Sequence, residues 1–316
     1  MDLIQTIDIK LFISKLPPDV ISLINLIMDQ GFELTLVGGS VRDFAICEEM
    51  SDDFDFELRD NNSIGHEEFL SKYKKLINYL ECNHNVICEP LPFLISRLKY
   101  NDCEIELSIP RLENYKETQN AKKHRDFGVD FDSRLIHKDA FLRRDFTINS
   151  LGIHFQEKCL FENAVFIDPQ GGLEDLSQGK LKTCNPDFNS DPVRFLRMIR
   201  FHLRFGFELD DSLKVGTFNL QKLTFYYIEK EFNTLCNKNF FHRMWCYLDN
   251  EQININAELQ SISFLKDLSL CDGLELYDNI LKSFQNNNTT DVQVLLLSSL
   301  FGWKKKTILK ILKQIK

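Results

Sequence analysis

The spacing of apolar residues predicts regular elements over the first part of the chain. An apolar run at residues 34–37 predicts a buried strand, and Asp53 to Leu58 alternates acidic with apolar residues, as a strand with one buried face does. Residues 19–30 and 66–81 carry apolar side chains at helical spacing, and Asp19 is predicted to cap the first of these helices. Strands and helices are therefore expected to alternate along this region.

Two further strands are predicted at residues 93–100 and 103–109, on either side of a hairpin turn at Asn101-Asp102. The order α-β-α-β-α-β-β predicts an α+β fold, a small mixed sheet with helices packed on it. Residues 111–138 are rich in charge and show no hydrophobic period, which predicts a surface loop. Residues 208–316 are predicted to be helical and to end in a basic amphipathic helix.

A glycine turn joins the first predicted strand to a helix. Gly38 and Gly39 end the strand, and Ser40 is predicted to cap the helix that follows. Such a turn presents backbone N–H groups and the positive end of a helix dipole, which together suit a phosphate. Arg42 lies one turn further on and can bind a phosphate through two hydrogen bonds. Two glycines alone would more often mark an ordinary turn.

Two carboxylates follow on the next strand. Asp53 and Asp55 are predicted to share one face, because side chains alternate along a strand, while Phe54 points to the other. Neighbouring carboxylates can bind Mg²⁺ ions that also contact substrate phosphates. By the same alternation Glu104 and Glu106 share a face of the last strand, so either can supply a third carboxylate or remain an exposed charge.

Two arginine-rich segments come later in the chain. Residues 141–153 read FLRRDFTINSLGI, a composition that an ordinary salt-bridged helix surface also has. Residues 191–205 predict a helix with Asp191 as its cap and Pro192 at its first position. Its arginines recur at intervals of three or four residues and form one basic face, opposite an apolar one. The arginines of this face are Arg194, Arg197, Arg200 and Arg204.

The motifs GGSVRD, DFD, RRDFTINS and DPVRFLRMIR, in this order, resemble the signatures of the nucleotidyltransferase superfamily. The GGSVRD form resembles its branch of tRNA nucleotidyltransferases and bacterial poly(A) polymerases. The resemblance covers about residues 33–206. It implies a catalytic head that binds Mg²⁺ through Asp53 and Asp55, with Gly38, Gly39, Ser40 and Arg42 at the nucleotide.

The same resemblance implies roles for the later motifs. Glu106 becomes the third catalytic carboxylate, because EIELSIPRLE resembles the family strand in which a glutamate precedes an arginine by five residues. Residues of the RRDFTINS motif would hold the ribose and triphosphate, and residues of the arginine helix would read the base. The first set is Arg144, Asp145 and Asn149, and the second is Asp191 and Arg194 with Arg197 and Arg200 nearby. The CCA-adding form usually has glutamate where this chain has Ser190.

Composition excludes few function classes. The net charge of −9 argues against indiscriminate nucleic-acid binding but allows a local basic surface. The nine cysteines have no framework spacing, which is typical of reduced thiols in the cytosol. No apolar run is long enough for a transmembrane helix, and no targeting signal is recognised. A cytoplasmic protein with no membrane partner is expected.

The chain is predicted to comprise an N-terminal extension and helix (1–32), a catalytic head (33–155), a base-reading neck (156–210) and an RNA-binding helical body (211–316). The resemblance implies addition of CMP and AMP from CTP and ATP to the 3′ end of tRNA, with release of pyrophosphate. The alternatives are a poly(A) polymerase and a catalytically idle RNA-binding module. The product and the oligomeric state stay open at this point.

Overall fold

The computed structural model describes residues 7–60, 64–114, 128–156 and 163–213. The chain divides into two compact units, the first with residues 1–117 and 128–186 and the second with residues 118–127 and 187–316. The predicted C-terminal helices and the middle of the predicted charged loop lie outside the described residues. The predicted boundaries of head, neck and body stay predictions.

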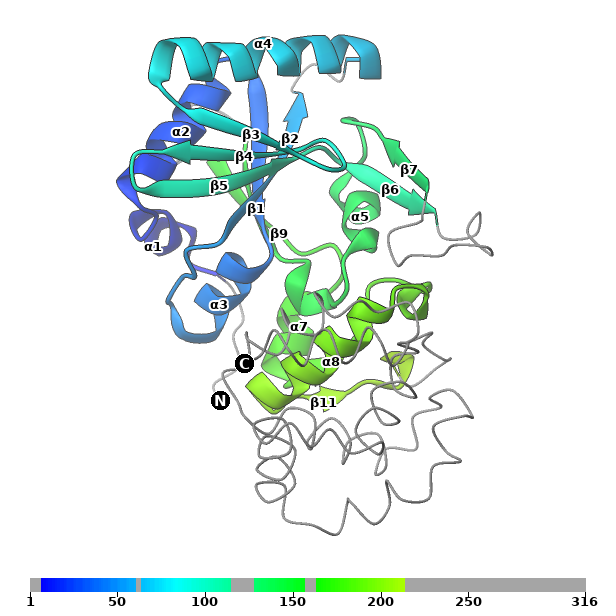
Figure 1. The fold of residues 1–316 in the computed structure, drawn as a ribbon. Coiled ribbons are helices and arrows are strands. Elements are labelled where there is room, and N and C mark those ends of the chain that lie inside the picture. Colours follow the sequence, from blue (N-terminus) through cyan, green and yellow to red (C-terminus); the bar gives the residue numbers. More distant parts are fainter. Residues whose placement is uncertain (1–6, 61–63, 115–127, 157–162, 214–316) are drawn as a thin grey trace, which may run out of the picture. The chain divides into compact units, whose positions relative to one another are not determined.

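The first unit is built on a seven-stranded sheet with the strand order β3-β4-β5-β2-β1-β8-β9 (Figure 1). Neighbouring strands run antiparallel, except β2 and β5, which run parallel. The sheet is therefore mixed and the fold is α+β, as predicted. The strands are β1 (Phe32–Val37), β2 (Phe54–Asp60), β3 (Ile87–Leu91), β4 (Ile95–Tyr100), β5 (Cys103–Ser108), β8 (Gly152–Phe155) and β9 (Ala164–Ile167).

The remaining elements of the first unit are a second small sheet, several helices and two 3₁₀ turns. They are α1 (Ile9–Ser14), α2 (Pro18–Met28), α3 (Gly39–Cys47), α4 (His66–His84), the paired strands β6 (Arg111–Asn114) and β7 (Gly128–Phe131), α5 (His137–Ala140), η2 (Phe141–Arg143), η3 (Thr147–Asn149), α7 (Gly172–Ser177) and β10 (Lys180–Leu181). The second unit contains η4 (Phe188–Ser190), α8 (Pro192–Phe205), β11 (Glu208–Leu209) and η5 (Asp211–Leu213).

Alternation along the strands gives the central sheet two different faces. We call one of them the apolar face; its residues are all buried, and they are Leu34, Leu36, Phe54, Phe56, Leu58, Ile105, Leu107, Ile153 and Phe155. The polar face lies on the other side and is set by the same pairing register. Its residues are Thr35, Asp55, Glu57, Arg59, Glu106, Ser108 and His154.

Helices α2 and α4 pack on the sheet, α2 against β1 and β5 and α4 against β3. Phe69 of α4 meets Phe32 edge-on, with 5.8 Å between the ring centroids. The hydroxyls of Tyr73 and Ser96 lie 2.6 Å apart. The predicted helix at 66–81 is thus confirmed and continues to His84, and its apolar stripe seals the apolar face.

Other predicted elements need correction. Helix α2 has Pro17 as its N-cap residue, without a side-chain cap, so the predicted Asp19 cap is wrong. The prolines at its start already fix φ at helix-compatible values. The turn at Asn101-Asp102 is confirmed, since Tyr100 pairs with Cys103. The predicted strand at 93–100 begins only at Ile95, because a turn precedes it.

That turn follows an edge strand that the sequence did not predict, β3. Its residues alternate in no clear way and are mostly exposed, so hydrophobic periodicity gave no signal. The predicted loop at 111–138 is also wrong in its described parts, where β6 pairs with β7 and α5 follows. Backbone pairing supports these short elements despite their charge.

No helix within the described ranges is long and apolar enough to cross a membrane. The five cysteines for which the structure gives a state are free thiols, as their scattered spacing predicted.

Candidate functional site

A glycine turn connects β1 to α3 and lies against two charged side chains. Gly38 has φ 89° and ψ −128°, a conformation that in practice only glycine adopts. A Cβ atom at this position would lie 3.4 Å from Arg144 Nη1 and 4.0 Å from Asp55 Oδ2. Gly38 therefore satisfies the turn geometry and allows both charged groups to come close to the backbone.

The helix after this turn begins at Gly39, and no side chain caps it. The predicted Ser40 cap is therefore wrong, because Ser40 lies inside the first turn. Its hydroxyl instead donates a hydrogen bond to the carbonyl oxygen of Asp53. This bond joins the glycine turn to the start of β2, where the two aspartates are found.

The aspartate pair lies at the start of β2. Asp53 is exposed and Asp55 is half-buried. Burial, together with the charges of Asp53 and Glu106, raises the pKa of Asp55 to about 6, against the opposing charge of Arg144. The acidic groups are thus close enough to repel one another, which is the condition that a bound cation relieves.

The two candidates for a third carboxylate differ in position. Glu106 pairs in register with Asp55 on the parallel strand β5, whereas Glu104 lies two residues away and is half exposed. Glu106 accepts a hydrogen bond of 2.9 Å from Arg97 Nη2. Within the described part of the chain, no three His, Cys, Asp or Glu side chains converge enough to hold a metal by themselves. Asp53 and Asp55 fit a cation that also takes phosphate oxygens, as Mg²⁺ usually does.

The second motif forms 3₁₀ turns, not a salt-bridged helix surface. Asp145 and Asn149 are both buried. Asn149 Nδ2 donates to Asp145 Oδ1 at 2.9 Å, and Arg42 Nη1 donates to Asn149 Oδ1 at 2.6 Å. Arg42 also binds Asp43 Oδ1, at 2.6 Å from Nη2. These bonds join the first motif to the second, which lies about a hundred residues later.

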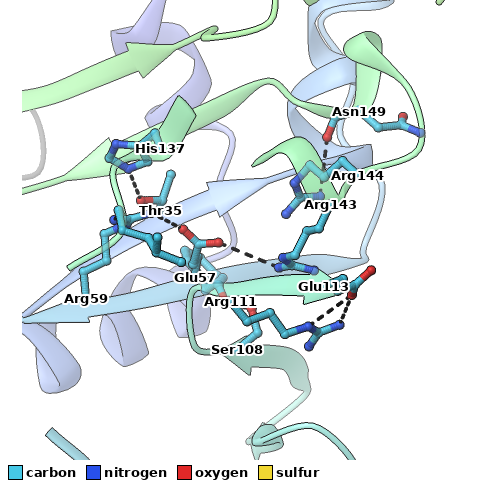
Figure 2. Close-up of polar contacts among 12 residues, drawn as sticks. Thr35, Glu57, Arg59, Ser108, Arg111, Glu113, His137, Arg143, Arg144 and Asn149 are labelled. Atoms are coloured by element: carbon cyan, nitrogen blue, oxygen red, sulfur yellow. Dashed lines mark hydrogen bonds and ion pairs between the residues drawn. The ribbon is translucent and has the colours of Figure 1, made fainter. Parts of the chain in front are cut away.

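Arg144 is the cation that faces the glycine turn. Its Nη1 lies 3.4 Å from the carbonyl oxygen of Asn149 (Figure 2). Its guanidinium lies 5.2 Å from the Phe141 ring centroid. Its Nε is buried and has no hydrogen-bond partner among the described residues. Burial and the charge of Arg143 lower the pKa of Arg144 to about 10, so the side chain stays positive at neutral pH. A bound anion would supply the missing acceptor.

Sequence reasoning missed a third acidic residue on this strand. Glu57 follows Asp55 by two residues and is fully buried. Burial alone would raise its pKa, but the charges of Arg59, Arg143 and Arg144 outweigh burial and lower it. The signal was present in the sequence, since Glu57 continues the alternation that Asp53 and Asp55 begin.

The hydroxyl of Thr35 lies between two histidine side chains on the polar face. The Thr35 hydroxyl lies 3.0 Å from His137 Nε2 (Figure 2). It also lies 2.9 Å from His154 Nδ1. Burial and the charge of Arg59 together lower the pKa of His137 to about 4. His137 is therefore neutral at pH 7, so it adds no positive charge to the arginines beside it.

The arginine helix of the third motif is α8 in the second unit. Asp191 is confirmed as its N-cap, because Oδ1 accepts a hydrogen bond of 2.9 Å from Val193 N. The basic face is unevenly exposed: Arg194 and Arg200 are buried, whereas Arg197 is half-buried. The guanidinium of Arg200 lies 4.8 Å from the Phe201 ring centroid, which compensates part of the desolvation.

The structure thus brings together the predicted residues of the first unit. Those at one end of the polar face are Gly38, Gly39, Ser40, Arg42, Asp53, Asp55, Glu106, Arg144, Asp145 and Asn149. The remaining predicted residues lie on or next to α8 in the second unit, which is described by itself. They are Asp191, Arg194, Arg197 and Arg200.

Comparison with known proteins gives matches over the same region. Residues 34–182 match the family model of the poly A polymerase head domain. An A-adding tRNA nucleotidyltransferase of Aquifex aeolicus is 32% identical over 179 residues, which are 56% of this chain and 19% of the relative. A multifunctional CCA protein of Stenotrophomonas maltophilia is 37% identical over 90 residues, which are 28% of this chain and 21% of the relative. The matched region thus spans about a fifth of these curated relatives.

Solved structures share the fold at lower sequence identity. A CCA-adding enzyme in an apo form is 21% identical, with a TM-score of 0.59 over 96% of this chain and 69% of the other. A CCA-adding enzyme of Thermotoga maritima complexed with tRNA is 20% identical, with a TM-score of 0.55 over 92% of this chain and 64% of the other. These structures establish the fold of the described head, with its mixed sheet and helices.

Proposed function

We propose that this chain is a member of the tRNA nucleotidyltransferase and poly(A) polymerase family and adds nucleotides to the 3′ end of tRNA. The 3′-hydroxyl of the RNA attacks the α-phosphorus of CTP or ATP. A phosphodiester bond forms, the bond from the α-phosphorus to the bridging oxygen breaks, and pyrophosphate leaves. The product is the CCA end of tRNA or part of it.

One observation carries this proposal: the glycine turn, the aspartate pair and the RRDFTINS motif meet at one end of the polar face. Each motif alone has an ordinary structural explanation. Together they place one exposed carboxylate, one half-buried carboxylate and the half-buried Arg144 side chain around a helix N-terminus that no side chain caps. Such a combination suits a nucleoside triphosphate, whose phosphates need both cations and N–H donors.

Different residues of the first unit bind the triphosphate and the sugar of the nucleotide. Arg144 and the N–H groups at the start of α3, from Gly39 and Ser40 onward, bind the triphosphate. Asp145 and Asn149 orient the ribose, and their mutual hydrogen bond fixes which atoms face the sugar. Arg42 is already bonded to Asn149 and acts on the nucleotide through it. A deoxynucleotide would leave one of these buried polar groups unpaired, which provides selection for ribose.

The donor set at the start of β2 fits a divalent metal ion. Asp53 and Asp55 would hold it, with Glu106 as the neighbouring carboxylate, and we propose Mg²⁺ because the donors are hard oxygens. When bound, the ion supplies Lewis-acid stabilisation of the charge on the reacting phosphate. The chain's own part is to keep Asp55 half-buried between Asp53 and Arg144, so that a cation is favoured there.

Base recognition is assigned to α8. Asp191 and Arg194 offer an acceptor and a donor fork of the kind that matches the edge of a base, with Arg197 and Arg200 as further cations. A protein that reads the base with its own side chains needs no nucleic-acid template. A poly(A) polymerase remains the second candidate, because the matched family model takes its name from that activity.

The test is nucleotide addition by the full purified chain. Three tRNA transcripts that lack one, two or three nucleotides of the CCA end are each given labelled CTP and ATP with Mg²⁺. CCA addition predicts that CTP extends the two shorter transcripts and that ATP completes the longest. Long tails made from ATP alone on all three would favour the poly(A) polymerase, and no addition to any transcript would contradict the proposal.

A further inference from the structure

Glu57 is a buried carboxylate on the polar face to which the proposed reaction gives no role. Its side chain has 0% exposure, so it can contact neither a nucleotide nor RNA in solution. A buried carboxylate is unfavourable unless cations compensate it. Glu57 lies two residues after Asp55 on β2, at the inner end of the proposed site.

Two arginines provide this compensation, and they come from different elements. Arg59 Nη2, on the same strand, donates a hydrogen bond to Glu57 Oε1. Arg143 Nη2, in η2, lies 3.7 Å from Glu57 Oε2 (Figure 2). Oε2 is buried and accepts no hydrogen bond from the described residues, so Arg143 is its partner by charge. Glu57 therefore ties η2 to the central sheet.

The ion pair between Glu57 and Arg143 lies next to Arg144, the residue that faces the glycine turn. Arg143 and Arg144 are adjacent, and two neighbouring guanidinium groups repel each other. Glu57 holds Arg143 on the sheet side, while Arg144 Nη1 approaches Gly38. Without the carboxylate, three arginines would share this region with less opposing charge, and Arg143 would lose its ion pair with Glu57.

Arg59 explains why Glu57 is itself fixed. Arg59 Nη1 donates to the carbonyl oxygen of Leu135, just before α5, so one guanidinium bridges Glu57 and the segment that leads into the second motif. Glu57 Oε1 is thereby committed to Arg59, and only Oε2 faces Arg143. The contacts therefore run from Arg59 through Glu57 to Arg143, which is next to Arg144.

We propose that Glu57 is a positioning residue that holds Arg143 and so aims Arg144 at the triphosphate of the incoming nucleotide. This inference rests on the proposed function, because it requires a nucleoside triphosphate at the Gly38 turn. According to this proposal, binding of the triphosphate depends on Glu57, whereas binding of the metal ion and recognition of the base do not.

The test compares Glu57→Gln, which keeps the shape and removes the charge, with Glu57→Asp, which keeps the charge. Glu33→Gln on β1 is the matched control, since Glu33 pairs with His154 at 3.5 Å and not with the arginine pair. Binding of ATP and of AMP to the full chain is measured calorimetrically with Mg²⁺ and without RNA, so that no addition takes place.

Glu57→Gln should weaken ATP binding about tenfold and leave AMP binding unchanged. The reason is that a misplaced Arg144 loses its charge-assisted contact with the triphosphate, which AMP does not have. Glu57→Asp should retain part of the affinity, and Glu33→Gln all of it. Unchanged ATP affinity in Glu57→Gln, or an equal loss for ATP and AMP, would overturn the inference.

A double-variant cycle tests the route through Arg143. If Glu57 acts through Arg143, the double variant Glu57→Gln/Arg143→Gln binds ATP no more weakly than Arg143→Gln alone. Losses that add up would overturn the inference. If Glu57→Gln does not fold, as judged by circular dichroism, the cycle is run with Glu57→Asp against Arg143→Lys, under the same criterion.

Two further measurements distinguish this inference from a metal-binding role of Glu57 and from the proposed function. Mn²⁺ binding without nucleotide should be the same in Glu57→Gln and the unaltered chain; a loss would instead make Glu57 a metal ligand. If the unaltered chain binds ATP with the predicted coupling but adds no nucleotide to RNA, the proposed function fails while the positioning role stands.

Discussion

The two faces of the central sheet are formed by the same strands but depend on different physical interactions. On the apolar face, side chains such as Phe56 and Leu58 are buried against helices by the hydrophobic effect, which is non-directional. On the polar face, the side chains one residue earlier, Asp55 and Glu57, are held by specific charged partners. One face therefore determines whether the unit folds, and the other determines what it can bind.

This difference predicts that substitutions one residue apart have different consequences. Apolar contacts tolerate exchange of similar shapes and lose stability in proportion to the volume removed. A charge pair loses function when one partner is removed, because the other is left buried and misdirected. The predictions below test this separation.

The largest effect is expected for the aspartate pair. Asp53→Ala or Asp55→Ala should reduce nucleotide addition at least about a thousandfold, since each removes a carboxylate from the proposed metal site. The exposed neighbour Asp52 is the matched control, and Asp52→Ala should keep its activity. RNA binding, measured by filter retention, should be nearly unchanged in all three. Near-normal activity in both aspartate variants would contradict the claim that the polar face determines binding and function.

On the apolar face, Phe56→Ala should lower the free energy of unfolding by about 3–5 kcal/mol, because it leaves a cavity beneath the helices. Phe56 has 0% exposure. Ile87, with 65% exposure on the edge strand β3, is the control, and Ile87→Ala should change stability by less than about 0.5 kcal/mol. Chemical denaturation followed by circular dichroism measures both. Equal effects would show that burial does not determine stability here.

Replacing Asp55 on the polar face should raise the free energy of unfolding, whereas replacing Phe56 should lower it. The pKa of Asp55 is raised from 3.8 to about 6 in the folded chain, so above pH 6 its charge opposes folding. Asp55→Asn should therefore stabilise the metal-free chain at pH 8 by about 1–3 kcal/mol. The gain should shrink as the pH falls from 6 to 4, where Asp55 becomes protonated. Denaturation of both proteins in EDTA at pH 8 and pH 4 measures this gain, with Asp52→Asn as the control. Destabilisation of the Asp55→Asn variant at pH 8 would contradict the prediction.

The smallest effect concerns Asp191, which combines a structural and a proposed functional role in one side chain. Loss of its cap in Asp191→Ala should lower stability by about 1 kcal/mol. If Asp191 also reads the base, discrimination of C and A against U and G should fall by about tenfold or more. The exchange Asp191→Ser keeps a capping group and should restore stability alone. Unchanged nucleotide selectivity in Asp191→Ala would leave the residue as a helix cap.

Much of this arrangement was predictable because it depends on local patterns. Alternation along β2 placed Asp53 and Asp55 together, and the Asp191-Pro192 pair predicted the start of α8. The Ser40 cap failed because Gly38 is the N-cap residue, so the helix starts two residues earlier than predicted. Gly38 also lies beside Arg144 and Asp55, a proximity that no local pattern encodes.

The parts that were missed depend on contacts between distant segments. Glu57 and Arg143 are far apart in sequence, and nothing local to either one indicates the other. The pairing of β6 with β7 was hidden in the same way, because each strand has only four residues and no clear hydrophobic alternation, while the strands are joined by backbone hydrogen bonds. The sequence therefore indicated candidate residues for the site, and the fold shows which partners they contact.

The central claim is that the Gly38 turn, the aspartate pair and Arg144 form one nucleotide site on the polar face. A crystal structure of the full chain with Mg²⁺ and a non-hydrolysable ATP analogue tests it most directly. The account predicts the triphosphate at the N-terminus of α3, in contact with Arg144, with a metal ion on Asp53 and Asp55. A nucleotide bound elsewhere at saturating concentration, with Arg144 contacting no phosphate, would contradict it.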